Sequence, residues 1–527
     1  MSFVSTFVCL SLLCAPKEAG AVEQPDAERR PNIVVILADD MGFSDLGCYG
    51  SEIETPNLDR LAAGGVRFTQ FYNTARCCPT RAALLTGLYQ HQAGVGQMAN
   101  DLGFPSYQGY LNGRCATIAE LLRDAGYVTL MSGKWHVGER PPHWPRQRGF
   151  DRYFGLISGA CSYWELMPRR KMAFDDAPWR PDPQDDSFYM TDAFGDHAVR
   201  FLDEHAARGK PFFLYLPFTA PHWPLHAWPE DIAKYRGKYL AGWDKLRRQR
   251  HQRMIELGIV EANWKLSPRH PNVPSWQSVE DKDVQDLRMA VYAAMIDRMD
   301  QNIGRVMSKI DELGATDKTL VMFLSDNGGC HVMVNRGKPG IPPGPRGGFW
   351  GYDYPWANAS NTPLRMFKQF THEGGIATPL ICYWPDGIKQ ARRLTKQTGH
   401  VIDIMPTCLE AAGVDYAETF DGRELIPLEG ESLLPAMRNP KANEPRTLYW
   451  EHIGSKAVRS GDWKLVADRD RKTWELYDLV ADRTELHDLS SKRPEKANEL
   501  LAAWDAWATR VGVVDRQTIE KRRKRNK

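Results

Sequence analysis

The residues best suited to chemistry lie close together, in the run from Cys77 to Arg81. Pro79 fits the first position of a helix, where the N–H that proline lacks has no partner to lose. Residues four apart share a helix face, so Arg81 is predicted to project beside Cys77. A thiol near the N-terminus of a helix lies in a positive potential, which favours anions and the thiolate form. The spacing therefore predicts a cysteine in an anion-stabilising environment.

A second group of residues has the chemistry of a metal site. Its members follow two apolar runs, 33–37 and 320–324, at the strand ends where α/β folds build their sites. Four hard oxygen donors without His or Cys among them suit Ca²⁺ or Mg²⁺ better than zinc. Each pair by itself also fits a turn or a helix cap. The four residues are Asp39, Asp40, Asp326 and Asn327.

Basic residues follow two further apolar runs. The run 127–131 leads to Lys134 and His136, and residues two apart in an extended segment face the same way. The run 212–217 leads to His222, whose flanking prolines hold the turn rigid and could fix the direction of the imidazole. A lone histidine beside tryptophan is more often structural, so these residues alone leave both interpretations open.

A longer pattern, C-x-P-[S/T]-R-x-x-x-L-T-G, runs from Cys77 to Gly87 and closely resembles the maturation motif of the sulfatase family. Thr80 stands where serine is commoner, which the motif tolerates. The sequences G-K-W-H at 133–136 and A-P-H-W-P-L at 220–225 are similar to further blocks of that family. The resemblance covers roughly residues 31–479 and is closest to the bacterial arylsulfatase branch of the alkaline phosphatase superfamily.

This resemblance implies an arylsulfatase-type sulfuric ester hydrolase. Cys77 would be converted to formylglycine (3-oxoalanine) by a formylglycine-generating enzyme, and the hydrated aldehyde, a gem-diol, would attack sulfur and form a covalent sulfo-enzyme intermediate. One divalent cation, usually Ca²⁺, would be held by Asp39, Asp40, Cys77, Asp326 and Asn327. The residues implied to be catalytic are Cys77, Arg81, Lys134, His136, His222 and Lys368.

The resemblance also implies a role for each basic residue. His222 would protonate the departing oxygen, and His136 would take a proton from the second hydroxyl so that sulfate leaves. Lys134 and Lys368 would neutralise the sulfuryl oxygens as charge shifts in the transition state. Lys368 lies in a looser match and by itself is a surface lysine. The expected substrate is a sulfated small molecule or glycan, with a carbohydrate sulfate favoured.

Three alternatives remain open at this point. A phosphodiesterase or phosphonate monoester hydrolase of the same superfamily could use the same residues, because a phosphoryl group presents similar oxygens. A non-catalytic protein that binds sulfated glycans would apply if Cys77 were never oxidised. A vicinal disulfide between Cys77 and Cys78 is the structural alternative for that pair, although such rings are strained.

Short apolar runs that alternate with amphipathic stretches over residues 31–435 predict an α/β domain, with a large mostly parallel (mixed) sheet sandwiched by helices. The stretches 163–183 and 235–274 show little strand pattern and are expected to be insertions. Residues 436–515 predict a smaller C-terminal subdomain, an antiparallel sheet plus a helix, and 516–527 a frayed basic tail. The expected strands are 33–37, 127–131, 212–217, 320–324, 380–383, 447–450, 457–460, 463–467 and 474–479, and the expected helices are 57–63, 117–125, 191–207, 284–313 and 494–511.

The composition is that of an ordinary globular protein, with 42% apolar and 25% charged residues in a chain of 527. A net charge of +2 gives no reason to expect a nucleic-acid partner. Residues 3–13 form an apolar run too short to span a bilayer, and a possible cleavage site ends at Ala21. We therefore expect a signal peptide at 1–21, export to the periplasm or the medium, and no stable membrane span. Lipoprotein attachment through Cys14 is disfavoured because bulky Leu13 precedes it.

Overall fold

The computed structural model describes residues 30–206, 209–439, 442, 444–469 and 473–525, so the predicted signal peptide lies outside the described residues. The centre of the protein is an 11-stranded mixed sheet in the order β10-β2-β9-β8-β1-β7-β3-β4-β5-β6, with β11 beside β2. Its strands are β1 (Asn32–Ala38), β2 (Val66–Tyr72), β3 (Val128–Ser132), β4 (Arg152–Leu156), β5 (Met172–Phe174), β6 (Ala177–Trp179), β7 (Phe212–Pro217), β8 (Thr319–Ser325), β9 (Ala377–Tyr383), β10 (Arg393–Thr395) and β11 (Gly399–His400).

Four neighbouring strands in the middle of this sheet, β8-β1-β7-β3, all run parallel. Every residue of β7 and β8 is buried, because helices cover both faces of the sheet. This double burial is the reason that these strands are continuous apolar runs in the sequence. The predicted α/β class with a large mixed sheet is confirmed, since β9 pairs antiparallel with both β2 and β8.

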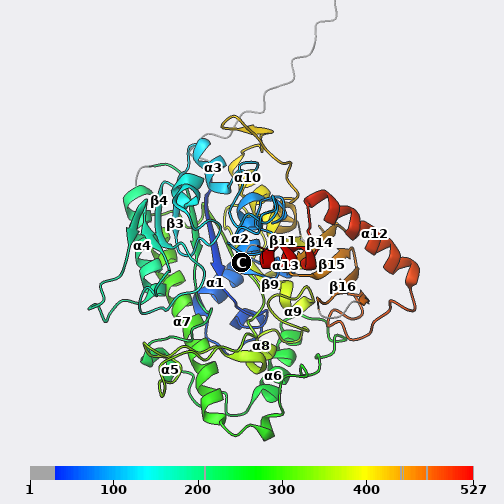
Figure 1. The fold of residues 1–527 in the computed structure, drawn as a ribbon. Helices are drawn as coiled ribbons and strands as arrows, with labels where there is room; N and C mark the ends of the chain where they lie inside the picture. The colour runs from blue at the N-terminus through cyan, green and yellow to red at the C-terminus, as the bar shows by residue number, and fades with distance from the viewer. Residues whose placement is uncertain (1–29, 207–208, 440–441, 443, 470–472, 526–527) are drawn as a thin grey trace, which may run out of the picture.

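Two helical layers enclose the sheet (Figure 1). Helices α1, α4, α5 and α7 pack together in one layer, and α2, α3 and α10 pack together in the other. No helix in the described parts of the chain is long and apolar enough to cross a membrane. The helices are α1 (Pro56–Gly64), α2 (Cys77–Thr86), α3 (Ile118–Asp124), α4 (Met190–Ala206), α5 (Pro229–Ala233), α6 (Trp243–Glu256), α7 (Lys282–Glu312), α8 (Asp353–Ser360), α9 (Glu373–Ile376), α10 (Ile404–Ala412), α11 (Leu434–Arg438), α12 (Pro494–Val511) and α13 (Arg516–Arg525).

The C-terminal part forms a four-stranded antiparallel sheet, as the sequence predicts. Its strands are β14 (Thr447–His452), β15 (Ser455–Ser460), β16 (Trp463–Ala467) and β17 (Trp474–Asp478). Helix α12 packs on this sheet through a face that includes Trp504 and Trp507, and the Trp507 ring stacks on Tyr449 with centroids 5.2 Å apart. A separate two-stranded ribbon is formed by β12 (Thr419–Phe420) and β13 (Arg423–Glu424).

The start of α2 differs from the expectation. The helix begins at Cys77, so Pro79 occupies the third position, not the first. The first four N–H groups of any helix lack intrahelical partners, so proline is harmless at either position. The first hydrogen bond of the helix runs from the N–H of Thr80 to the carbonyl of Arg76, at 2.9 Å.

Other local features differ from the sequence-based description. The basic C-terminal segment forms helix α13 over its described residues because Ile519 packs against Leu102 and Tyr107. The stretch 163–183 contributes β5 and β6 to an edge of the main sheet, and 235–274 holds α6. Strand β2 was missed because Arg67 and Gln70 interrupt its apolar pattern, although most of the strand is buried.

Candidate active site

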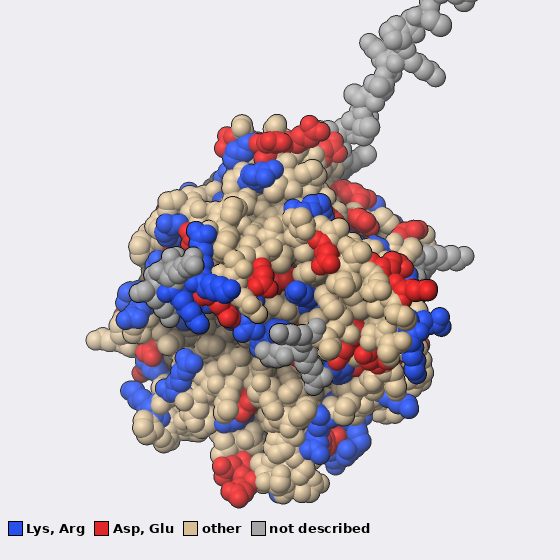
Figure 2. All heavy atoms as spheres, turned by 45° about the vertical axis from the view of Figure 1, so that its right-hand side comes forward, with Lys and Arg blue, Asp and Glu red and all other residues tan. Residues whose placement is uncertain are grey.

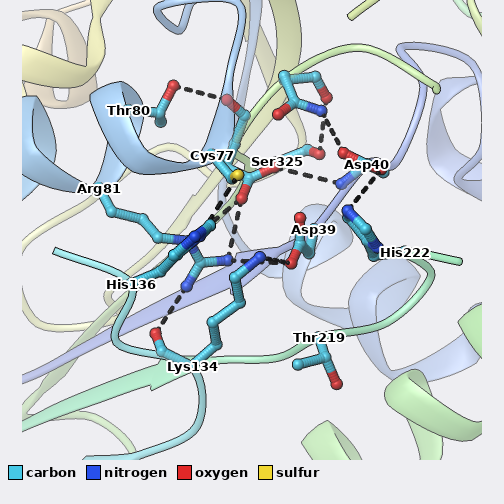
Figure 3. Close-up of polar contacts among 12 residues, drawn as sticks. Asp39, Asp40, Cys77, Thr80, Arg81, Lys134, His136, Thr219, His222 and Ser325 are labelled. Carbon is cyan, nitrogen blue, oxygen red and sulfur yellow. Dashed lines mark hydrogen bonds and ion pairs between the residues drawn. The ribbon is translucent and has the colours of Figure 1, made fainter. Parts of the chain in front are cut away.

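The carboxyl ends of the four central parallel strands lie at one edge of the sheet, and most of the predicted site residues follow them. They are Asp39 and Asp40 after β1, Lys134 and His136 after β3, His222 after β7, and Asp326 and Asn327 after β8. Cys77, at the start of α2, points into this group (Figure 3). Lys368, from the segment before α9, reaches it through Asp40. The fold therefore gathers every residue that the sequence singled out.

The oxygen donors form a connected cluster. Asn327 Nδ2 donates to Asp40 Oδ1 at 2.6 Å, and the N–H of Asp40 donates to Asp326 Oδ1 at 3.2 Å. Three buried oxygens, Asp39 Oδ1, Asp40 Oδ2 and Asn327 Oδ1, accept no hydrogen bond from any residue that the structure describes. Burying such groups without a partner is costly, and hard oxygen donors are the preferred ligands of Ca²⁺ and Mg²⁺. The residues therefore fit one divalent cation.

The charges in the cluster support the same fit. Burial opposes ionisation of Asp39, but Lys134, His222 and Arg81 together lower its pKa to about 2. For Asp326 the balance is opposite, because burial and the nearby Asp39 raise its pKa well above the usual range despite Arg81. A cation at the unpartnered oxygens would reduce this repulsion between the carboxylates.

Cys77 is 2% exposed, and its Sγ lies 3.5 Å from Nδ1 of His136. A hydrogen bond from Cys78 holds the pKa of the Cys77 thiol well below its usual range. The positive charges of Lys134 and Lys368, and the neighbouring His136, lower it further, against the effect of burial. Burial instead raises the pKa of Cys78 well above the usual range. Both cysteines are free thiols, so the structure does not contain the vicinal disulfide.

Each buried cation of the site is paired with a carboxylate. Arg81 donates to Asp326 Oδ2 through Nε at 3.2 Å and Nη2 at 2.9 Å, and its Nη1 donates to the carbonyl of Lys134 at 2.7 Å. Lys134 Nζ lies 2.5 Å from Asp39 Oδ2. Lys368 Nζ lies 2.5 Å from Asp40 Oδ1. These contacts place two ammonium groups and a guanidinium around the Cys77 side of the cluster.

The two histidines have different surroundings. Nδ1 of His222 donates to the carbonyl of Trp223 at 2.6 Å, which leaves Nε2 facing Asp40 Oδ2 at 3.4 Å. Burial lowers the pKa of His222, and Asp40 acts in the opposite direction. Burial also lowers the pKa of His136, to about 4, so this ring is neutral at pH 7 and can accept a proton.

Some residues that shape the site gave no signal in the sequence. Gly159 packs against His136, and a Cβ at this position would lie 2.6 Å from Cε1 and Nε2 of the imidazole. The hydroxyl of Tyr163, in the stretch expected to be an insertion, contacts the carbonyls of Thr219 and His222 at 2.7 and 2.9 Å. Thr80 was only a motif residue, and its hydroxyl donates to the carbonyl of Asp326 at 2.6 Å.

Comparison with known proteins agrees with this arrangement. Residues 31–414 match the family model "Sulfatase", and residues 365–503 match "N-sulphoglucosamine sulphohydrolase, C-terminal". An uncharacterized sulfatase of Schizosaccharomyces pombe is 38% identical over 92% of this chain and 95% of its own length. An arylsulfatase of Klebsiella aerogenes is 34% identical over 77% of this chain and 92% of its own.

Among solved structures, that of Ps i-CgsB in complex with k-i-k-neocarrahexaose superposes with a TM-score of 0.68. It is 26% identical and covers 91% of this chain and 93% of the other. The chain therefore belongs to the sulfatase family and is an enzyme that hydrolyses sulfate esters.

Proposed function

We propose that this sulfatase hydrolyses a carbohydrate sulfate, with Cys77 oxidised to formylglycine by a formylglycine-generating enzyme and one Ca²⁺ at the carboxylate cluster. The observation that carries the proposal is the position of Cys77. Its buried Sγ lies beside His136, at the start of a helix. Next to it are a cluster with three unpartnered oxygens and the cations that pair with its carboxylates.

The residues of the site have different roles in this reaction. Asp39, Asp40, Asp326 and Asn327 would hold the cation, which supplies positive charge at the sulfate, while hydrated formylglycine supplies the hydroxyl that attacks sulfur. Lys134 and Lys368 neutralise the sulfuryl oxygens as negative charge moves onto them. Both lysines are buried, so their charge acts at low effective dielectric.

Proton transfer is assigned to the two histidines. His222 acts in its imidazolium form, which the carboxylate of Asp40 favours at 3.4 Å from Nε2. It gives the Nε2 proton to the departing oxygen and is left as a neutral imidazole, whose Nδ1–H stays on the carbonyl of Trp223 and fixes the ring. His136 is neutral at pH 7 and accepts a proton from the residue-77 side, where its Nδ1 points at Sγ. An acid and a base thus face the reacting group from two sides.

A carbohydrate substrate is favoured by the relatives. Ps i-CgsB, which is 26% identical, has been solved with a bound neocarrahexaose, an oligosaccharide. The C-terminal match to the sulphoglucosamine sulphohydrolase family points the same way. We further propose that the protein is exported, with cleavage after Ala21. N-terminal sequencing of the secreted chain tests this, and a mature chain that still begins at Met1 contradicts it.

Sulfate release from para-nitrophenyl sulfate, with para-nitrophenyl phosphate and a phosphonate ester alongside, tests the reaction. The protein is co-expressed with a formylglycine-generating enzyme, and intact mass reports the aldehyde at position 77. We expect sulfate release that exceeds both phosphorus-ester activities, is lost in Cys77→Ala and is kept in Cys48→Ala, a control thiol outside the site. Preference for a phosphorus ester would instead assign the protein to the phosphodiesterase and phosphonate hydrolase class.

A further inference from the structure

An arginine without a partner in the described part of the chain lies next to the proposed nucleophile. Arg76 directly precedes Cys77 and is half-buried, and its side chain forms no hydrogen bond or ion pair with any residue in the described ranges. Its Nε is fully buried and has no acceptor among those residues. A charged group that is taken out of water without a counter-charge is costly. The position therefore favours an anion that the described residues do not supply.

A histidine of the C-terminal sheet is also buried without a hydrogen-bond partner among the described residues. His452 ends β14 and is 0% exposed, yet neither Nδ1 nor Nε2 has a hydrogen-bond partner among the described residues. Ser455 lies opposite in the β14–β15 pair, and its buried Oγ is also without a partner. A neutral imidazole offers one donor and one acceptor, and buried polar groups are seldom left unsatisfied.

A chain of contacts connects these two places. The N–H of Gln369 donates to the carbonyl of Ala75, in the segment that leads into α2, at 2.8 Å. Nη1 of Arg469 donates to Oε1 of Gln369 at 3.0 Å. Cβ of Arg469 lies 3.4 Å from where a Cβ on Gly454 would be, in the turn that follows His452. Gln369 and Arg469 therefore lie between the segment that leads into α2 and the end of β14.

The charges act on one another over this short range. Burial lowers the pKa of His452 well below its usual range, Arg76 and Arg469 lower it further, and Cys77 acts in the opposite direction. The imidazole is thus neutral at pH 7 and within electrostatic reach of residue 77. Figure 2, which turns the right-hand side of Figure 1 forward, shows Lys and Arg side chains beside a hollow in the surface that faces the viewer.

We propose that Arg76, His452 and Arg469 form a second anion subsite beside the catalytic sulfate site, and that the natural substrate carries a second sulfate or carboxylate group. This inference deepens the proposed function, on which it rests for the position of the first sulfate. The catalytic lysines, Lys134 and Lys368, are each tied to a carboxylate of the metal cluster. Arg76 has no such carboxylate among the residues that the structure describes, so a substrate with one anionic group would leave it unpaired.

Calorimetric titration of the full-length matured enzyme with Ca²⁺ tests the subsite without any turnover. The probes are ethanesulfonate, which carries one anion, ethanedisulfonate, which carries two sulfonates, and sulfopropanoate, which replaces the second sulfonate by a carboxylate. We expect at least one of the two dianions to bind about tenfold or more tightly than ethanesulfonate, the size of one charge-assisted hydrogen bond. If only the disulfonate binds tightly, the second group of the substrate is a sulfate. If only sulfopropanoate binds tightly, the second group is a carboxylate.

Variants decide whether the named residues are responsible. Arg76→Gln should reduce the dianion preference to about twofold, and His452→Gln should reduce it in part. Arg248→Gln, which removes an equal charge from the exposed side of α6, should leave it unchanged. Equal binding of all three probes by the wild type, or a full preference kept by Arg76→Gln, would overturn the proposal. An enzyme that prefers a dianion but releases no sulfate would contradict the proposed reaction and leave the subsite standing.

Discussion

A buried ion-pair network joins the main sheet to the C-terminal sheet, and Glu373→Gln is the substitution that tests it. Glu373, in α9, is fully buried, with Oε1 2.8 Å from Lys464 Nζ and Oε2 2.9 Å from Arg483 Nε. The hydroxyl of Tyr72 also donates to Oε2, at 2.9 Å. Lys464 belongs to β16 and contacts Glu485 Oε1 at 2.9 Å. Removing the Glu373 charge leaves Glu485 as the closest carboxylate of Lys464 and removes the ion pair of Arg483.

The size of the effect follows from the same contacts. Burial alone would raise the pKa of Glu373, but Lys464, Arg483 and Arg459 hold it at about 2, against an ordinary value of 4.5. This difference corresponds to about 3 kcal/mol in the free energy of unfolding, close to the cost of breaking a buried ion pair by removing one partner. Because the pKa is lowered in the folded state, the contribution is complete above about pH 4.5 and is lost as the pH falls toward about 2.

Urea unfolding at pH 7 should therefore give a free energy of unfolding about 3 kcal/mol lower for Glu373→Gln than for wild type. The difference should shrink as the pH is lowered below 4.5. Glu424→Gln, at an exposed position of β13, is the matched control. Adding Lys464→Met should make the double variant less unstable than the sum of the two single variants. A loss below about 1 kcal/mol, or a loss that does not change between pH 7 and pH 3, would refute this reasoning.

Three further predictions concern catalysis. His222→Gln removes the proposed acid and should lower kcat on sugar sulfates by a factor of about 10²–10⁴. The loss should be much smaller on para-nitrophenyl sulfate, because its leaving group needs no proton. Equal losses of kcat on both esters would contradict this role of His222. Exhaustive chelation should abolish sulfate release and lower the melting temperature, because it leaves the buried oxygens of Asp39 and Asp40 without a ligand. Adding Ca²⁺ should restore both. Full activity in the chelated enzyme would contradict the cation site. Gly159→Ala should displace His136 and lower kcat by a factor of about 10², which is measured together with KM on the same ester. A wild-type kcat would show that the loop around residue 159 moves and leaves the imidazole in place.

The sequence predicts the central strands and the residues at their ends because local rules suffice there. Strands buried on both faces are continuous apolar runs, and polar residues that follow such runs have to lie at the sheet edge. Asp39 and Asp326 are of this kind. Strand β2 escapes because its partner β9 lies about three hundred residues away and its outward positions hold Arg67 and Gln70. Such a strand is specified by tertiary packing more than by its own pattern.

The proposed second subsite could not be predicted for a different reason. Arg76 and His452 are ordinary residue types, separated by most of the chain. What marks them is the absence of a partner once they are buried among the described residues, which is a property of the assembled structure. A motif search reports residue types at fixed spacing and cannot report an unsatisfied hydrogen bond. The candidate catalytic residues can therefore be predicted from the sequence, whereas the residues of the proposed second subsite can be found only in the folded structure.

The charge balance of the catalytic cluster leads to a last prediction. Each carboxylate has its own cation: Lys134 lies 2.5 Å from Asp39, Lys368 2.5 Å from Asp40 and Arg81 2.9 Å from Asp326. These three pairs offset one another, so we expect the catalytic cluster without a bound cation to attract a sulfate weakly. A divalent cation at the unpartnered oxygens would add positive charge and would compete with the lysines for the carboxylates, so that the lysines could face the sulfate.

We therefore expect the cation and the sulfate to bind with positive coupling, and the coupling must be reciprocal. Titration of inorganic sulfate with and without Ca²⁺, and of Ca²⁺ with and without sulfate, should give the same factor, about tenfold or more. Lys368→Met should reduce that factor, because one of the two lysines that the cation frees is gone. A sulfate affinity that does not depend on Ca²⁺ would mean that the lysines already face the anion, and that the pairing with Asp39 and Asp40 does not restrain them.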